Sequence, residues 1–129
     1  EYSDSGAIRT ADYLRMQKHI DPTLGIYAAY AYQVAGKTDA IRSVLRYMKR
    51  DSGLVPYDVA LLSRERGLAN DVAPFCPMLT QGWALLELGA NAPEILFELR
   101  RMLIPSLWTT FTHKGVTVVA DAIGRGELK

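Results

Sequence analysis

The sequence predicts an all-α fold, a compact bundle of about six or seven helices built from αα-hairpins. Three observations favour this fold class. Apolar residues recur through most of the chain at the i, i+3, i+4, i+7 spacing of an amphipathic helix. Proline and glycine mark the ends of most of these segments. The chain of 129 residues is 49% hydrophobic and 22% charged, which suits a single domain, residues 1–129, with its own core.

The segment 21–36, DPTLGIYAAYAYQVAG, is predicted to be a central helix around which the other helices pack. Asp21 suits the N-cap and Pro22 the first helical position, while Gly36 suits the left-handed residue that closes a helix. No charged residue lies between these ends, and a helix that is apolar nearly all round is typically buried. Small residues such as Ala31 allow neighbouring helices to approach closely. The segment is too short to span a bilayer, so we expect no membrane insertion.

Five further helices are predicted from the same apolar spacing. In chain order, they run from about Gly6 to His19, from a cap at Thr38 to a break at Ser52-Gly53, from Pro56 to Arg66, from Pro77 to a cap at Gly89, and from Asn91 and Pro93 to Pro105. The short link after Gly36 makes the second and third helices of the chain an αα-hairpin. The fifth helix of the chain carries an apolar stripe made of Leu79, Gly82, Trp83 and Leu86.

The region 107–120 allows two interpretations. Its two halves, LWTTFT and VTVVA, are dense in β-branched residues, and the HKG tripeptide between them could form the turn of a short β-hairpin. The alternative is a short helix that includes Trp108 and Phe111. We favour the helix because every preceding element is predicted to be helical.

Composition and charge exclude several classes of function. The formal net charge of +1 gives no electrostatic basis for binding nucleic acid or an acidic membrane. Two histidines and one cysteine, far apart in the chain, match no metal-ligand spacing, and the glycines form no phosphate loop, so we expect no cofactor. A single cysteine, Cys76, fits a reducing compartment, and we therefore expect a cytoplasmic location. The start at Glu1 without a methionine suggests a fragment of a larger protein.

A basic stripe on the third helix is one candidate interaction surface. The stripe consists of Arg42, Arg46, Lys49 and Arg50, and it could meet an acidic protein partner or phosphate groups. The alternative, which we favour, is an ordinary solvated helix face. It is indicated by three acidic residues nearby in the sequence, which are Asp39, Asp51 and Asp58.

The loop 68–77 is a second candidate surface. It lacks clear periodicity and is long for a compact helical domain, and such loops are often functional. We expect it to pack back over the helices with Phe75 as its anchor and to border a binding surface that includes Asp71; a plain ordered connection is equally compatible with the sequence. Cys76 precedes a predicted helix, where a lowered pKa could make its thiol a nucleophile. A buried, inert thiol is the simpler interpretation because no positioned base is evident.

Two stretches resemble known families. Within residues 21–50, Leu24-Gly25, Tyr27, Ala35-Gly36 and a following amphipathic helix are similar to a helix pair of the tetratricopeptide type. Tyr27 comes one place before the family's tyrosine position, and no period of about 34 residues recurs, so the resemblance implies a related αα-hairpin rather than a repeat array. DPTLGIYAAYAY together with PFCPMLTQGWALL is similar to uncharacterised helical regions that accompany caspase-like peptidases in bacteria. That resemblance carries over no catalytic residue and implies an accessory domain of a bacterial protein.

The sequence therefore predicts a non-enzymatic helical protein-interaction or accessory domain of a larger protein. Its expected partner is another protein or a neighbouring domain of the same chain. The candidate interaction residues are Arg42, Arg46, Lys49, Asp71 and Phe75. The alternative is a small ligand-binding or thiol-dependent enzyme domain centred on Cys76 and the loop 68–77.

Overall fold

The computed structural model describes residues 4–17, 22–65, 71–89 and 92–128. Within these residues the regular structure is helical, and the strand-like contacts are isolated β-bridges that form no sheet. The predicted all-α fold class is confirmed. The helices, in chain order, are α1 (Asp4–Gln17), α2 (Thr23–Val34), α3 (Thr38–Ser52), α4 (Tyr57–Ser63), η1 (Thr80–Leu88), α5 (Glu94–Leu99), η2 (Arg100–Met102) and α6 (His113–Gly124). The elements η1 and η2 are 3₁₀-helices.

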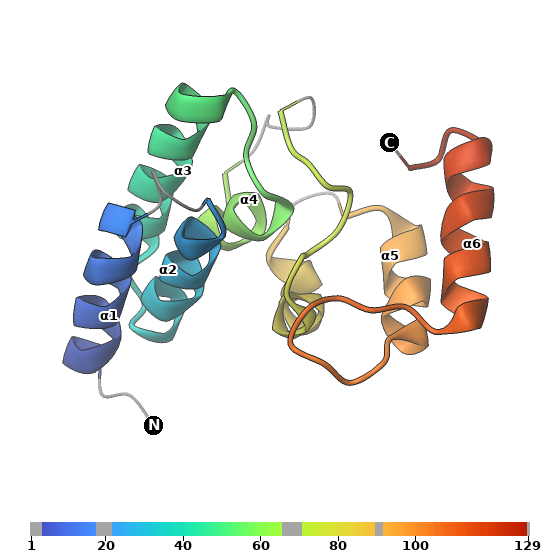
Figure 1. Ribbon diagram of the computed structural model, residues 1–129, viewed down its shortest axis with the longest axis horizontal. Helices are drawn as coiled ribbons and strands as arrows, with labels where there is room; N and C mark the ends of the chain where they lie inside the picture. Colours follow the sequence, from blue (N-terminus) through green and yellow to red (C-terminus); the bar gives the residue numbers. More distant parts are fainter. Residues whose placement is uncertain (1–3, 18–21, 66–70, 90–91, 129) are drawn as a thin grey trace.

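The helices form two groups that are joined by η1 (Figure 1). α1, α2 and α3 lie side by side with α4 against them, whereas α5 and α6 lie together at the opposite end of the molecule. Each group has its own cluster of buried hydrophobic residues. The first cluster includes Ile26, Ile41, Leu45 and Leu79, and the second includes Trp83, Leu86, Leu96, Leu99 and Ala122.

The apolar stripe predicted for the fifth helix is buried and connects the two clusters. Leu79, just before η1, belongs to the first cluster, whereas Trp83 belongs to the second. The element is a 3₁₀-helix and not the α-helix expected from Pro77 onwards. It begins later because Leu79 is extended, at φ −94° and ψ 137°, and because the amides of Met78 and Leu79 both donate to the carboxylate of Asp58.

α2 is the buried helix that the sequence predicts. Its buried residues are Gly25, Ile26, Ala28, Ala29, Tyr30 and Tyr32. Gly36 closes it in the left-handed region, at φ +70°, as expected. Two details differ from the prediction. Pro22 occupies the N-cap position, with Asp21 outside the described residues, and Ala31 is only half-buried.

Two helix ends nearby also differ from the predicted ones. Thr38 is the first residue of α3, and the position before the helix makes no side-chain cap, so the predicted Thr38 cap is wrong. α4 ends at Ser63, and the helix expected to run to Arg66 is therefore shorter. It ends there because Arg64 adopts the left-handed region, at φ 59°, which a right-handed helix cannot include.

The segment 103–112 is extended rather than helical. Leu103 pairs with Phe111, and Leu79 pairs with Trp108, in isolated antiparallel bridges. The sixth predicted helix therefore ends with η2, and LWTTFT packs beside earlier parts of the chain instead of forming a hairpin with the residues that follow it.

α6 occupies the second half of the ambiguous region 107–120. Thr112 caps it, because its Oγ1 accepts a hydrogen bond from the Gly115 N–H at 3.1 Å. The HKG tripeptide is the first turn of a helix, so the hairpin alternative is wrong and the favoured helix is right only from His113 onwards. Glycine suits position 115 because a Cβ there would lie 3.0 Å from the carbonyl oxygen of Met102.

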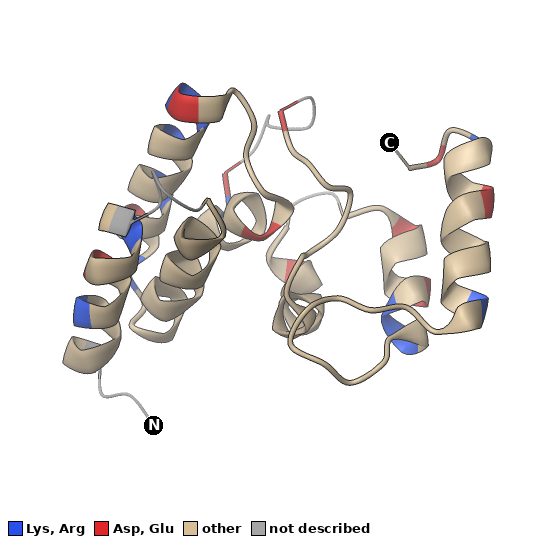
Figure 2. Ribbon diagram, in the orientation of Figure 1, with Lys and Arg blue, Asp and Glu red and all other residues tan. Residues whose placement is uncertain are grey.

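Charged residues are prominent on the outer helices (Figure 2). α1, α3 and α6 carry both signs of charge, whereas α2 carries none. In the part of the chain that is described, no helix combines the length and the apolar character needed to cross a membrane.

Candidate functional site

An open groove of about 500 Å³ lies where α1, α2 and η1 meet. It is lined by Thr10 and Leu14 of α1, by Tyr27, Tyr30, Ala31, Gln33 and Val34 of α2, and by Gln81, Ala84 and Leu85 of η1. Positions 27, 31 and 34 of α2 are spaced i, i+4 and i+7, and positions 10 and 14 of α1 are spaced i and i+4, so each of these helices presents one stripe to the groove. The groove is therefore formed by one face of each of α1, α2 and η1.

None of the described residues that line this groove is charged. Its side chains are apolar, aromatic or, like those of Thr10, Gln33 and Gln81, polar and uncharged. Val34 and Ala84, on opposite walls, are exposed, with 61% of Val34 open to solvent. A contiguous exposed apolar surface of this kind is typical of binding sites, whereas isolated surface hydrophobics are ordinary.

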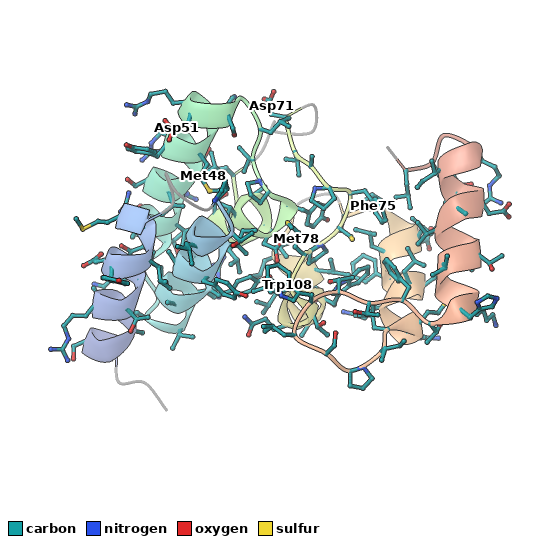
Figure 3. The ribbon with its side chains drawn as sticks, in the orientation of Figure 1. Met48, Asp51, Asp71, Phe75, Met78 and Trp108 are labelled. Carbon is teal, nitrogen blue, oxygen red and sulfur yellow. The ribbon has the colours of Figure 1, made fainter. Side chains whose placement is uncertain are left out.

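One edge of the groove continues onto the exposed segment Leu107-Trp108. The ring of Trp108 meets the ring of Tyr27 edge-on, with 5.8 Å between the ring centroids and 68° between the planes. Leu107 is 59% exposed and Trp108 is 38% exposed. Figure 3 shows Trp108 in the middle of the molecule, between the two helix groups. The segment is held in place by the Thr80 N–H, which donates to the Leu107 carbonyl at 3.0 Å.

A buried carboxylate, Asp58 of α4, accepts hydrogen bonds that connect two walls of the groove. Asp58 is 0% exposed. Its Oδ2 accepts from the Tyr30 hydroxyl at 2.6 Å and from the Leu79 N–H at 3.1 Å, and its Oδ1 accepts from the Met78 N–H at 2.6 Å. Tyr30 belongs to α2, and the two amides lead directly into η1. A buried charge needs such partners, because burial without them costs several kcal/mol.

Gly82 of η1 allows the Tyr30 hydroxyl to reach this carboxylate. A Cβ at position 82 would collide with the Tyr30 hydroxyl oxygen and would lie 2.8 Å from the Cβ of Pro77. Glycine is therefore needed here for a close approach of side chains, not for an unusual backbone conformation. The predicted stripe included Gly82 as a helix-packing residue, and its position explains why a residue without a side chain stands there.

The surroundings of Asp58 shift two pKa values. Burial raises the pKa of the Asp58 carboxyl above its ordinary value of 3.8, although the hydrogen bonds from Met78, Tyr30 and Leu79 oppose this. Burial, and then the charge of Asp58, raises the pKa of the Tyr30 hydroxyl. Tyr30 therefore remains a hydrogen-bond donor at neutral pH.

The raised pKa of Asp58 predicts a pH dependence of stability. The folded protein takes up a proton at Asp58 at a higher pH than the unfolded chain does. The stability gained from this proton is complete below the unfolded value of 3.8 and is lost as the pH rises through the folded pKa. The unfolding free energy of the wild-type protein minus that of Asp58→Asn, which cannot titrate, should therefore grow between about pH 7 and about pH 4. Urea unfolding of both proteins measures this; a difference that shrinks on acidification would mean that the hydrogen bonds outweigh burial.

The predicted basic stripe of α3 faces acidic side chains. Arg46 Nη1 lies 3.6 Å from Glu65 Oε1, and Lys49 Nζ lies 3.2 Å from Asp71 Oδ2. Arg42 Nε lies 3.9 Å from Glu65 and donates to a backbone carbonyl at the end of α4 at 3.0 Å. Exposed pairs of this kind contribute at most about 1 kcal/mol each. They offset the positive charge of the stripe, which favours its interpretation as a solvated helix face.

The predicted interaction residues fall in two places rather than one. Asp71 lies beside α3, where its carbonyl accepts from the Val55 N–H at 2.8 Å and its carboxylate meets Lys49. Phe75 is half-buried and packs against the second hydrophobic cluster. Figure 3 shows Asp71 near the end of α3 and Phe75 on the side of α5. Residues 68–70 of the predicted loop lie outside the described residues.

Cys76 is buried in the second cluster, with 5% of its surface exposed. Burial, and then the charge of Asp58, raises the pKa of its thiol to about 12. The reactive thiolate is therefore scarce at neutral pH. Of the two histidines, His113 stands at the exposed start of α6, and His19 lies outside the described residues.

We expect Cys76 to react slowly with alkylating agents in the folded protein. At about pH 7.5, iodoacetamide should modify it more than about 100-fold more slowly than it modifies free cysteine, because both access and thiolate are limited. Intact-mass spectrometry over time measures the rate, and the urea-unfolded protein is the control that should react fully. Cys76→Ser should lose only about 1–2 kcal/mol of stability. Rapid modification of the folded protein would instead support the thiol-dependent enzyme alternative.

Asp58 belongs to the candidate site, and its burial was not predicted from the sequence pattern. It was grouped with Asp39 and Asp51 as a solvated neighbour of the basic stripe, yet it is fully buried. A signal was available in the sequence. Leu61 and Leu62, three and four residues later in α4, are both buried. A carboxylate inside such an apolar stripe indicates a buried acceptor.

Comparisons with known proteins identified no relative of this chain. No family model matches the chain, and neither a curated protein nor a solved structure matches it. Among the residues that the structure describes, no three His, Cys, Asp or Glu side chains are grouped so that they could hold a metal ion. The candidate site is therefore defined by its own geometry, as an uncharged groove whose walls are joined through Asp58.

Proposed function

We propose that this chain is a non-enzymatic helical interaction domain that binds an amphipathic α-helix in the groove between α1, α2 and η1. The helix belongs to a partner protein or to a neighbouring domain of the same chain. The single observation that carries the proposal is a groove formed by three helical stripes, with exposed apolar walls and no charged side chain among the described residues that line it.

The stripes support a helix as the ligand. A helix packs its ridges of side chains into the grooves between the ridges of its neighbours. A fourth helix laid against α1, α2 and η1 would cover the half-buried Ala31 and the exposed Val34 and Ala84. Binding of an amphipathic helix in a hydrophobic groove is a recurring mode of protein recognition, with anchors spaced i, i+3, i+4 and i+7.

The lining also defines the chemistry of the bound face. Burying a charged side chain without a partner costs several kcal/mol. Among the described residues the groove lining offers no ion-pair partner, since its polar side chains are those of Thr10, Gln33, Gln81 and Tyr27, and the Tyr30 hydroxyl is turned toward Asp58. The bound face of the ligand helix must therefore carry no charged side chain, although its residues can be apolar or polar. Any charged residues of that helix must face solvent.

The other candidate sites have less support. Arg42, Arg46 and Lys49 already face Glu65 and Asp71, so an acidic partner would have to compete with those contacts. The buried thiol of Cys76, with its raised pKa, is poorly suited to nucleophilic chemistry.

The proposed setting is a larger bacterial protein with a caspase-like peptidase domain, in the cytoplasm. It rests on the resemblance of DPTLGIYAAYAY and PFCPMLTQGWALL to helical regions of such proteins and on the single cysteine. The tetratricopeptide-like pairing of α2 and α3 supports an interaction role by analogy.

The proposal is tested with peptides selected from a random library displayed on phage. We expect the selected peptides to carry apolar residues at i, i+3, i+4 and i+7 and no charge on that face. Val34→Glu should weaken their binding by about tenfold or more, because it places a charge in the groove. The matched control is Val116→Glu on α6, since Val116 is 54% exposed and lies outside the groove. Fluorescence anisotropy with labelled peptides gives the dissociation constants.

Two results would contradict the proposal. Selected peptides rich in Asp and Glu that lose binding to Arg46→Glu would move the site to α3. Equal loss of affinity in Val34→Glu and Val116→Glu would show that the groove has no special part in binding.

A further inference from the structure

The α2 wall and the η1 wall of the groove are connected through one buried residue. Its α2 wall and its η1 wall meet at Asp58, which is outside the groove lining and belongs to α4. From α2, the Tyr30 hydroxyl donates to Asp58 Oδ2 at 2.6 Å. From the lead into η1, the amides of Met78 and Leu79 donate to the same carboxylate. One buried acceptor therefore receives hydrogen bonds from both walls.

We infer that Asp58 and Tyr30 form a latch that sets the spacing between the α2 and η1 walls and so controls whether the groove admits a ligand helix. The spacing is a property of the unbound protein, whereas the consequence for ligand binding rests on the function proposed above. Asp58 and Tyr30 act as positioning residues, with the carboxylate outside the groove and the hydroxyl turned toward that carboxylate.

The latch has two separable halves. The amides of Met78 and Leu79 hold the start of η1 to α4. The Tyr30 hydroxyl carries the side-chain link that the structure describes from α2 to Asp58, and the missing side chain at Gly82 gives it room. Removing the hydroxyl would leave η1 attached to α4 while freeing α2 from the carboxylate. Tyr30→Phe is therefore the variant that removes the α2 half of the latch and keeps the η1 half.

A second tyrosine of α2 provides an internal control. The Tyr32 hydroxyl donates to the Asp12 carboxylate of α1, and Tyr32, like Tyr30, is buried. Tyr30→Phe and Tyr32→Phe thus remove the same chemical group, from the same helix, each from a bond to a carboxylate. Only the first of these bonds leads to η1.

The test measures distances between nitroxide spin labels by electron paramagnetic resonance in the unbound protein. One label pair, at Val34→Cys and Ala84→Cys, spans the α2 and η1 walls; a second, at Val34→Cys and Tyr13→Cys, spans α2 and α1. All three positions are exposed, whereas the native Cys76 is buried with a pKa of about 12 and should escape labelling.

We expect Tyr30→Phe to lengthen and broaden the distance between the α2 and η1 labels and to leave the α2 to α1 distance unchanged. Tyr32→Phe should leave the α2 to η1 distance unchanged. Gly82→Ala, which displaces the Tyr30 hydroxyl from the other side, should reproduce the effect of Tyr30→Phe. Circular dichroism confirms that each variant is folded before its distances are compared.

An α2 to η1 distance that is the same in wild type, Tyr30→Phe and Gly82→Ala would overturn the latch. So would an equal change in Tyr32→Phe, because it would reflect general loosening. Peptide affinity is read separately: about a tenfold loss in Tyr30→Phe with less than about a twofold loss in Tyr32→Phe links the latch to binding. If selected peptides bind elsewhere while the distance still responds to Tyr30→Phe, the proposed function fails and the latch stands.

Discussion

Asp58→Ala is expected to lower the free energy of unfolding by about 4 kcal/mol or more. The substitution leaves three donors without their acceptor, namely the Tyr30 hydroxyl and the amides of Met78 and Leu79. Each buried donor left unsatisfied costs about 1–3 kcal/mol. The loss is large because the carboxylate joins α2, α4 and the lead into η1, and all three would lose a contact at once.

Urea unfolding followed by circular dichroism measures this loss. Asp39→Ala is the control, because Asp39 is an exposed aspartate in the first turn of α3. It should cost no more than about 1 kcal/mol, as expected for an exposed charge near a helix N-terminus. Similar midpoints for Asp58→Ala and wild type would mean that the donors find other acceptors and that the buried carboxylate does not organise the fold.

Trp83→Ala is expected to cost about 3–5 kcal/mol, the range measured when a buried aromatic residue is truncated. Trp83 is 1% exposed at the centre of the second cluster, and its ring meets Phe111 edge-on at 5.8 Å between centroids. Its Nε1 donates to Thr109 Oγ1 at 2.8 Å. The variant would therefore leave a cavity and remove the hydrogen bond that Thr109 Oγ1 accepts, although the Thr109 hydroxyl would still donate to the Pro77 carbonyl.

The second tryptophan of the chain is the matched control for this variant. Trp108 is 38% exposed and lies at the edge of the groove, so Trp108→Ala should cost about 1 kcal/mol or less. Thermal unfolding followed by circular dichroism compares the two proteins. A larger loss for Trp108→Ala than for Trp83→Ala would contradict the description of the second cluster.

The sequence predicts α2 well because its burial follows from its own residues. A charge-free segment ending in Gly36 leaves few alternatives to a buried helix. The stripe through Leu79 and Trp83 was equally visible, since its spacing fits one face of a helix. Its 3₁₀ geometry was not predictable, because it depends on hydrogen bonds that Met78 and Leu79 make to a distant aspartate.

The conformation of the segment 103–112 was not predicted, because contacts far along the chain help to set it. Thr109 N–H donates to the Met78 carbonyl at 2.8 Å, and Trp83 donates to the Thr109 side chain. Local β-branched content indicated extended structure correctly, but the strand partner lay upstream and not in the next residues. Pairing of this kind has no local signal in a single sequence.

The groove itself was only partly predictable. Tyr27 and Tyr30, both on the predicted central helix, line the groove. Ala31, by contrast, was expected to allow a close helix contact, and it stands in the open groove instead. Which small residue is covered and which is left open depends on where η1 lies, and Asp58 accepts hydrogen bonds from the two residues that lead into η1.

The most direct test of the proposed function uses nuclear magnetic resonance of the isotope-labelled protein to map where a library-selected peptide binds. Binding in the groove predicts that the largest methyl shifts, and contacts to the peptide, fall on Leu14, Val34, Ala84 and Leu85. The ring signals of Trp108, at the edge of the groove, should also shift. Shifts centred on Arg46 and Lys49 of α3, with the groove methyls unchanged, would contradict the proposal that this chain binds its partner through the groove.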